Sequence, residues 1–403
     1  MKPGISKEAL KANNNYAILN LLYTGGAMPR KDIAEAIGLT PATVTLLTNE
    51  MINRGLLSEG GEITNESRAG RRKVLVDIDY DAAFVLGVYI EHRRVIAALS
   101  YMNGRLIDKL EFPLMPGSAP IGLVAQIKRF VGQSIDGRQL DPRKLRYVGV
   151  SVIGYVDTQN AVSENTFGLF ESNLTLGALF EEAFGVPVTV DNNVRSLAIA
   201  EIDYNRAIGK VSGLFVKHSP GLGGAIITDN ALYNGLHYHS GELGHFTVNI
   251  GGAPCVCGKR GCVETVVGRE ALIRKAAEIV NPDTTPVLWR LCLGSPGRIK
   301  LNMMAESARS GDLPIAHIMR DAAGVIALAV ENSMQLLDGN TVILFGDLFK
   351  DAWFFMRFSE KLREIGGGTL RYALRNSIIG NDDLWKAPVA IAARQLLRQL
   401  KQA

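Results

Sequence analysis

The chain has little cysteine, no long apolar run and almost no excess charge. Four cysteines in 403 residues are too few for a disulfide framework. No apolar run approaches the roughly 18 residues that a membrane-spanning helix needs. The first sixteen residues also lack the apolar core of a secretory signal. These absences lead us to expect a cytoplasmic protein with no membrane insertion.

The net charge is also small, but it is unevenly distributed. There are 44 Lys and Arg against 40 Asp and Glu, a balance of +4, which excludes a uniformly basic coat for nucleic acid. Residues 1–73 hold ten basic and seven acidic side chains, a balance of +3. The small excess at one end of the chain favours a nucleic-acid-binding module there.

Three helical patterns follow one another in this basic segment. Residues 7–23 form the first, Gly25 and Gly26 end it, and Pro29 introduces the second. Thr40 is a good N-cap for the third helix. Two short helices joined by a glycine-containing turn are typical of a helix-turn-helix. The small or neutral side chains that would face base edges in a major groove are Thr40, Ala42, Thr43, Thr45, Leu46 and Asn49.

A basic segment follows the third helix. Gly60 and Gly61 predict a hairpin turn, and the returning strand carries Arg68, Arg71 and Arg72. Such a wing suits phosphates or a narrow minor groove. The alternative is a small helical packing module whose charged segment is simply solvated.

From residue 80 onward, strands alternate with helices, which indicates an α/β architecture with two lobes around a cleft. The pattern shows no internal repeat of 20–50 residues. A glycine cluster at 221–224 separates two of the expected strands. The predicted strands are 84–90, 95–101, 106–112, 147–153, 188–190, 213–216, 225–227 and 341–345.

Three of the four cysteines cluster beside a histidine. His245, Cys255, Cys257 and Cys262 supply one imidazole and three thiolates, which fill a tetrahedral shell and predict a structural Zn²⁺. The alternative is a set of reduced core cysteines with an unrelated histidine. Because all four positions are filled by the protein, the ion would have no open position for catalysis.

The segment GELGH, followed by C-x-C-G-x-x-G-C-x-E, resembles the ROK family of repressors, open reading frames and sugar kinases. The winged helix-turn-helix resembles the repressor branch, which includes the glucose, N-acetylglucosamine and xylose repressors. The resemblance implies a DNA-binding domain at 1–77, a small lobe at 78–190 completed by a helix at 385–403, and a large lobe at 191–384. The large lobe would carry the zinc loop and the oligomer interface. The two lobes would form an actin-like, ribonuclease-H-like body of the sugar-kinase type.

The same resemblance implies an effector and partners. A sugar or sugar phosphate would bind between the lobes, and the residues that match the family's hydroxyl-binding positions are Gly154, Asn192, Glu242, His245 and Glu264. A homodimer or homotetramer would bind a double-stranded DNA operator. The implied function is a sugar-responsive transcriptional regulator, a repressor of carbohydrate uptake or metabolism genes.

Two departures from the kinases argue against an enzyme. The first phosphate loop of the kinases is replaced by residues 87–93, which include Glu91. Asn193 stands where the kinases have their general-base Asp, and an amide cannot take a proton from a sugar hydroxyl. The alternatives that stay open are an ATP-dependent hexose kinase and a regulator controlled by a transporter protein.

Overall fold

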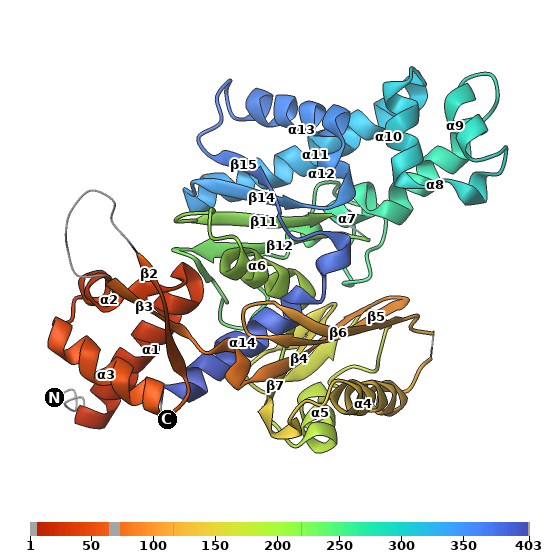
Figure 1. Cartoon of the computed structure of the whole chain (residues 1–403). Coiled ribbons are helices and arrows are strands. Elements are labelled where there is room, and N and C mark those ends of the chain that lie inside the picture. The colour runs from red at the N-terminus through yellow and green to blue at the C-terminus, as the bar shows by residue number, and fades with distance from the viewer. Residues whose placement is uncertain (1–5, 64–72, 116, 219, 402–403) are drawn as a thin grey trace. The chain divides into compact units, whose positions relative to one another are not determined.

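The computed structural model describes residues 6–63, 73–115, 117–218 and 220–401. The chain divides into two compact units. The first unit consists of residues 1–207 and 385–403, and the second of residues 208–384. Each unit contains one five-stranded sheet, and the first also contains a three-stranded sheet near the N-terminus (Figure 1).

The N-terminal part of the first unit is a winged helix. Thr40 accepts a hydrogen bond from the backbone N–H of Thr43 at 3.2 Å, which confirms it as an N-cap. The wing differs from the prediction, because the strand continues through Gly60 and Gly61 with only a shift in register there. The elements are α1 (Lys7–Gly25), β1 (Met28–Pro29), α2 (Arg30–Ile37), α3 (Pro41–Asn53), β2 (Leu57–Ile63) and β3 (Lys73–Ile78), and the strand order is β1-β3-β2.

The larger sheet of the first unit has the order β10-β7-β4-β5-β6. The first three strands along the chain form an antiparallel meander, and the next two add in parallel. Its strands are β4 (Phe84–Glu91), β5 (Arg94–Tyr101), β6 (Leu106–Phe112), β7 (Leu145–Val152) and β10 (Val188–Asn192). The remaining elements are α4 (Pro120–Gly137), β8 (Tyr155–Asp157), β9 (Val162–Asn165), α5 (Leu176–Phe184), α6 (Asn193–Tyr204) and α14 (Lys386–Leu400).

Helix α14 reaches the first unit from the far end of the chain and packs on its sheet (Figure 1). A Cβ at Gly149 would lie 2.0 Å from the backbone oxygen of Pro388, so only glycine permits this approach. Helices α14 and α6 also pack against each other. This packing places α6 in the first unit, whose boundary lies at 207/208, whereas the predicted lobe boundary was 190/191.

The second unit repeats the topology of the first, with strand order β13-β12-β11-β14-β15. Again a meander of three antiparallel strands is extended by two parallel ones. The two sheets confirm the ribonuclease-H-like fold class. The strands are β11 (Gly213–His218), β12 (Leu222–Thr228), β13 (Ala231–Leu232), β14 (Thr341–Phe345) and β15 (Ala373–Asn376). The helices are α7 (Val263–Val267), α8 (Arg269–Ile279), α9 (Pro286–Leu291), α10 (Leu301–Arg309), α11 (Leu313–Leu337), α12 (Asp347–Lys350) and α13 (Ala352–Ile365).

One described helix, α11, is long and apolar enough to cross a membrane by length and composition alone. Half of its most apolar window is buried in the protein. Its inward residues, among them Ile315, Met319 and Ile326, belong to the apolar core of the second unit. We therefore describe α11 as the core helix of that unit.

Candidate functional site

Helix α3 presents a neutral, partly apolar face to solvent. Ala42, Thr45 and Asn49 are exposed, and Leu46 is 61% exposed, a large fraction for a leucine. The Thr45 hydroxyl donates to the backbone oxygen of Pro41 at 2.8 Å, so the oxygen of this exposed side chain can still accept a hydrogen bond. Such a surface offers apolar contacts and hydrogen-bond acceptors to base edges.

Arg30, at the start of α2, is a residue of this surface that the sequence reasoning missed. Its Nε donates to Thr48 Oγ1 at 2.8 Å, and its Nη2 donates to Asn49 Oδ1 at 2.9 Å. The same Nη2 lies 2.6 Å from a carboxylate oxygen of Glu59 on β2. Because arginine only donates, Asn49 turns its oxygen toward Arg30 and keeps its NH₂ group for other partners. Nothing in the sequence spacing signals this contact.

The basic residues predicted for the wing, Arg68, Arg71 and Arg72, lie outside the described residues. Strands β2 and β3, which flank that segment, pair in antiparallel fashion. The predicted contribution of these three arginines to DNA binding therefore stays a prediction.

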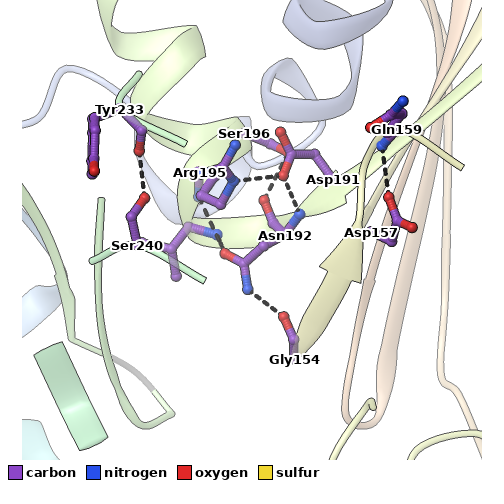
Figure 2. Close-up of polar contacts among 10 residues, drawn as sticks. Gly154, Asp157, Gln159, Asp191, Asn192, Arg195, Ser196, Tyr233 and Ser240 are labelled. Carbon is purple, nitrogen blue, oxygen red and sulfur yellow. Dashed lines mark hydrogen bonds and ion pairs between the residues drawn. The ribbon is translucent and has the colours of Figure 1, made fainter. Parts of the chain in front are cut away.

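In the first unit, two of the predicted effector residues are joined directly. Asn192 Nδ2 donates to the backbone oxygen of Gly154 at 2.8 Å (Figure 2). Asn192 Oδ1 accepts from the backbone N–H groups of Val194 and Arg195, so the same side chain is the N-cap of α6. Gly154 has φ +93°, and a Cβ there would lie 1.9 Å from the backbone oxygen of Asn165. No other residue fits that position.

A buried ion pair supports this helix start. Arg195 Nε lies 2.8 Å from Asp191 Oδ1, and both side chains are less than 7% exposed (Figure 2). Asp191 lies near the end of strand β10 and Arg195 lies in the first turn of α6, so the pair spans the junction of strand and helix. The pair holds the backbone around Asn192 on both sides of the cap.

A second polar cluster contains Glu91 and Asn193, the two residues at which the sequence resemblance implies departures from the kinases. Tyr89 Oη donates to Glu91 Oε1 at 2.8 Å, and Asn193 Nδ2 donates to the same oxygen at 3.0 Å. Burial raises the pKa of Tyr89 well above its usual value, and the charge of Glu91 raises it further. An amide at 193 is thus complementary to the Glu91 carboxylate, and an aspartate there would be repelled.

In the second unit, the four predicted metal ligands converge. The ligand atoms of His245, Cys255, Cys257 and Cys262 all lie within 4.8 Å of one another. Cys257 Sγ is 3.7 Å from Cys262 Sγ, and Cys255 Sγ is 3.5 Å from His245 Nδ1. Four ligands at about 2.3 Å from a tetrahedral Zn²⁺ lie about 3.8 Å apart, so the donor set and its spacing fit that ion.

The electrostatics of the cluster also fit a cation. Burial lowers the pKa of His245, and the charge of Lys259 lowers it further, so the imidazole is neutral as a metal ligand must be. Burial raises the pKa of the Cys255 thiol to about 12. Without a cation the thiols would therefore not all ionise at neutral pH, and a bound cation would favour the thiolates.

Glu242 and Glu264 take different positions in the second unit. Glu242 Oε2 lies 3.8 Å from His245 Nε2, the ring nitrogen that does not face Cys255. Glu264 is mostly buried, which raises its pKa, and it accepts a hydrogen bond from the backbone of Leu222. A Cβ at Gly221 would lie 2.0 Å from Glu264 Oε2, so the glycine cluster makes room for this carboxylate. The glycine cluster at 221–224 was expected to separate two strands, but strand β12 already begins at Leu222 and includes most of the cluster.

The sequence matches known families over most of its length. Residues 101–366 match the family described as "ROK family", and residues 13–58 match a winged helix-turn-helix DNA-binding family. The chain is 26% identical to the xylose repressor of Caldicellulosiruptor bescii, over 88% of each chain. It is 24% identical to the DNA-binding transcriptional dual regulator NagC of Escherichia coli, over 85% of this chain and 82% of that protein.

A solved structure shows the same fold. A ROK family transcriptional regulator described as a homologue of the E. coli Mlc protein superimposes with a TM-score of 0.79. The two chains are 20% identical, and the match covers 98% of this chain and 99% of the other. At this identity the match supports the architecture, with the winged helix included.

We expect Asn193→Asp to destabilise the first unit, because it brings a second carboxylate within about 3 Å of Glu91 and removes the amide donor. The loss should be about 1–3 kcal/mol in urea unfolding at pH 7. Glu91→Gln in the same chain should restore most of it, since the glutamine amide can donate to the new aspartate. Equal stability of the Asn193→Asp variant and the original chain would contradict the assigned contact.

Proposed function

The chain belongs to the ROK family, and we propose that it is a sugar-responsive DNA-binding transcriptional regulator that represses genes of carbohydrate uptake or metabolism. The observation that carries this proposal is the fusion of a winged helix to a ROK body in one chain. The capped helix α3, with its exposed neutral face, supports the DNA-binding role. The relative named as a xylose repressor supports the direction of control.

We propose that the effector is a sugar or sugar phosphate. Its contacts would be Gly154, Asn192, Glu242, His245 and Glu264, which offer backbone, amide, imidazole and carboxylate groups. Amide and carboxylate groups donate to and accept from several neighbouring hydroxyls, so such a set rejects analogues that lack them. With Nδ1 directed at the metal cluster, His245 keeps Nε2 for Glu242 or for a sugar oxygen.

We propose that the chain is not an enzyme. Asn193 cannot act as a general base, and the Glu91 carboxylate beside it would repel a phosphate. A coupled assay of ADP release over a panel of hexoses should give background rates for the original chain and for Asn193→Asp alike.

We further propose that the protein acts in the cytoplasm as a homodimer or homotetramer with one structural Zn²⁺ per chain. DNA duplexes have pseudo-twofold symmetry, so two copies would place two winged helices on successive half-sites. The zinc ion would be held by His245, Cys255, Cys257 and Cys262 and would stabilise the loop that precedes Glu264.

The function is tested by DNA binding and its response to sugars. Fluorescence anisotropy with duplex DNA from the region upstream of the coding gene should show a complex, and D-xylose, D-glucose, N-acetylglucosamine or its 6-phosphate should change its affinity by at least fivefold. The sugar response should be lost in Glu242→Gln, while DNA binding without sugar is kept. Absence of any complex at low salt would contradict the proposed function.

Replacement of Arg71 and Arg72 by alanine should flatten the salt dependence of DNA binding. Each lost phosphate contact lowers the slope of log K against log salt by about 1, so the double variant should lose about 2. Arg143→Ala is the matched control, because Arg143 lies in the first unit outside the winged helix and its side chain is 89% exposed. An unchanged slope in the double variant would show that the wing makes no phosphate contacts.

Cys257→Ser should reduce the zinc content and the thermal stability of the protein. Replacement of a residue that only hydrogen-bonds to a metal ligand lowers metal affinity roughly 10–100-fold. Replacement of the ligand itself should therefore lower the affinity at least as much. Metal analysis should give about one zinc per original chain. Cys292→Ser is the matched control, since Cys292 is buried but lies outside the cluster. A zinc-free variant with an unchanged melting temperature would contradict a structural role.

A further inference from the structure

Helix α6 connects the candidate effector residues to the winged helix. Its N-cap, Asn192, holds Gly154, and these two residues are candidate sugar contacts under the proposed function. The helix has 12 residues and is therefore about 18 Å long. Every residue from Asn193 to Asp203 is buried. A helix that is packed on all sides moves as one body, so a displacement of its first turn reaches its last turn.

The last turn of α6 carries a buried ion pair. The guanidinium of Arg394 on α14 donates to both carboxylate oxygens of Asp203, at distances of 2.6–3.0 Å. The Asp203 side chain is fully buried. Burial raises the pKa of Asp203, and the charge of Arg394 acts in the opposite direction. Such a pair is rigid, because either charge would be stranded in the interior if the two separated.

Parts of the winged helix lie near this end of α6 and near the residues that follow it. The buried ring of Tyr23, on α1, is near enough to Asp203 and Tyr204 for both to raise its pKa, after burial itself. Gly26, at the end of α1, faces Arg206, since a Cβ there would lie 2.7 Å from Arg206 Nη1. The charge of Arg206 also lowers the pKa of Asp77 on β3, which burial raises. Helix α1 therefore packs against the end of α6, and Arg206, two residues beyond that helix, faces Gly26 and acts on Asp77.

The contact between Tyr23 and α6 has one unusual feature. The Tyr23 hydroxyl is buried, yet it makes no hydrogen bond of good geometry to any described residue. A buried hydroxyl without a partner is unfavourable, and the Asp203 carboxylate is a strong acceptor near enough for Tyr23 to lower its pKa. A small displacement of the end of α6 would therefore be enough to complete a bond between these two side chains.

We propose that Tyr23, Asp203 and Arg394 are positioning residues that couple the effector residue Asn192 to the orientation of the winged helix. Helix α6 carries the displacement, and the pair of Asp203 with Arg394 keeps the carboxylate in place at its end. The bond between Tyr23 and Asp203 forms in only one of two arrangements of the winged helix. The inference rests on the proposed function for DNA binding, but it makes a separate claim about these three side chains.

A double-mutant cycle tests the coupling without any knowledge of the sugar. Asn192→Asp keeps the helix cap, because a carboxylate still accepts from the two backbone N–H groups, but it cannot donate to Gly154. Tyr23→Phe removes only the hydroxyl. DNA affinity is measured by anisotropy for the original chain, both single variants and the double variant, with duplex DNA from the region upstream of the coding gene.

We expect Asn192→Asp to change the dissociation constant for DNA by at least about fivefold in the original chain and by less than about twofold in the Tyr23→Phe chain. Tyr233→Phe is the matched control, because Tyr233 belongs to the second unit and is 56% exposed. In that background the full effect of Asn192→Asp should remain. Asp203→Asn should act as Tyr23→Phe does.

Independent sites at this separation normally give effects that multiply to within about twofold. The proposal would be overturned if the fold-change in the dissociation constant of the double variant equalled the product of the two single fold-changes. It would also be overturned if the Asn192→Asp variant bound DNA like the original chain. If Asn192→Asp does not fold by circular dichroism, Asn192→Ser replaces it, since serine is also a good N-cap and is too short to reach Gly154. Failure of the original chain to bind the duplex would overturn the proposed function and this inference together.

Discussion

The buried ion pair between Asp203 and Arg394 is the interaction on which the first unit depends. It joins α6, which starts at the end of a parallel strand, to α14, which comes from the opposite end of the chain. Charges are expensive to remove from water, so a pair of this kind tolerates no rearrangement of the two helices that would separate its members. Because α14 also lies against β4 and β7, the pair joins the last turn of α6 to a helix that contacts the sheet.

The local features of this chain could be predicted from residue spacing, whereas its long-range side-chain contacts could not. The packing of the C-terminal helix on the sheet of the first unit was expected only from the resemblance to the ROK family. Thr40 and the Cys255–Cys262 motif depend on neighbours a few residues away, so their roles follow from spacing alone. Arg30 on α2 binds Asn49 on α3. Asp203 binds Arg394, although the whole second unit lies between these two residues in the sequence. No pattern of residue types in the sequence predicts such partners. The predicted turn at Gly60–Gly61 was wrong because strand β2 absorbs these glycines with a shift in register. The repeated strand order of the two sheets is likewise absent from the sequence, since it requires no similarity of residues.

The cluster of Tyr89, Glu91 and Asn193 joins two residues that the resemblance identifies as departures from the kinases. The two departures look independent in the sequence, but they form one unit in the structure, because the Glu91 carboxylate accepts a hydrogen bond from the Asn193 amide. Reversal of either change alone would leave the other without its complement. Under the proposal that the chain is not an enzyme, the cluster stabilises the loss of phosphoryl transfer, and its recovery would require several simultaneous substitutions.

The position of α14 has a consequence for the order in which the molecule is made. Arg394 follows Asp203 by 191 residues, and a ribosome adding about 5–20 residues per second needs roughly 10–40 s to cover that distance. During this interval the winged helix is already synthesised, but the buried carboxylate that lies beside Tyr23 lacks its cation. The nascent chain thus exposes its DNA-binding surface before the body can hold it in one orientation. Full control over DNA begins only when translation of the gene is nearly complete.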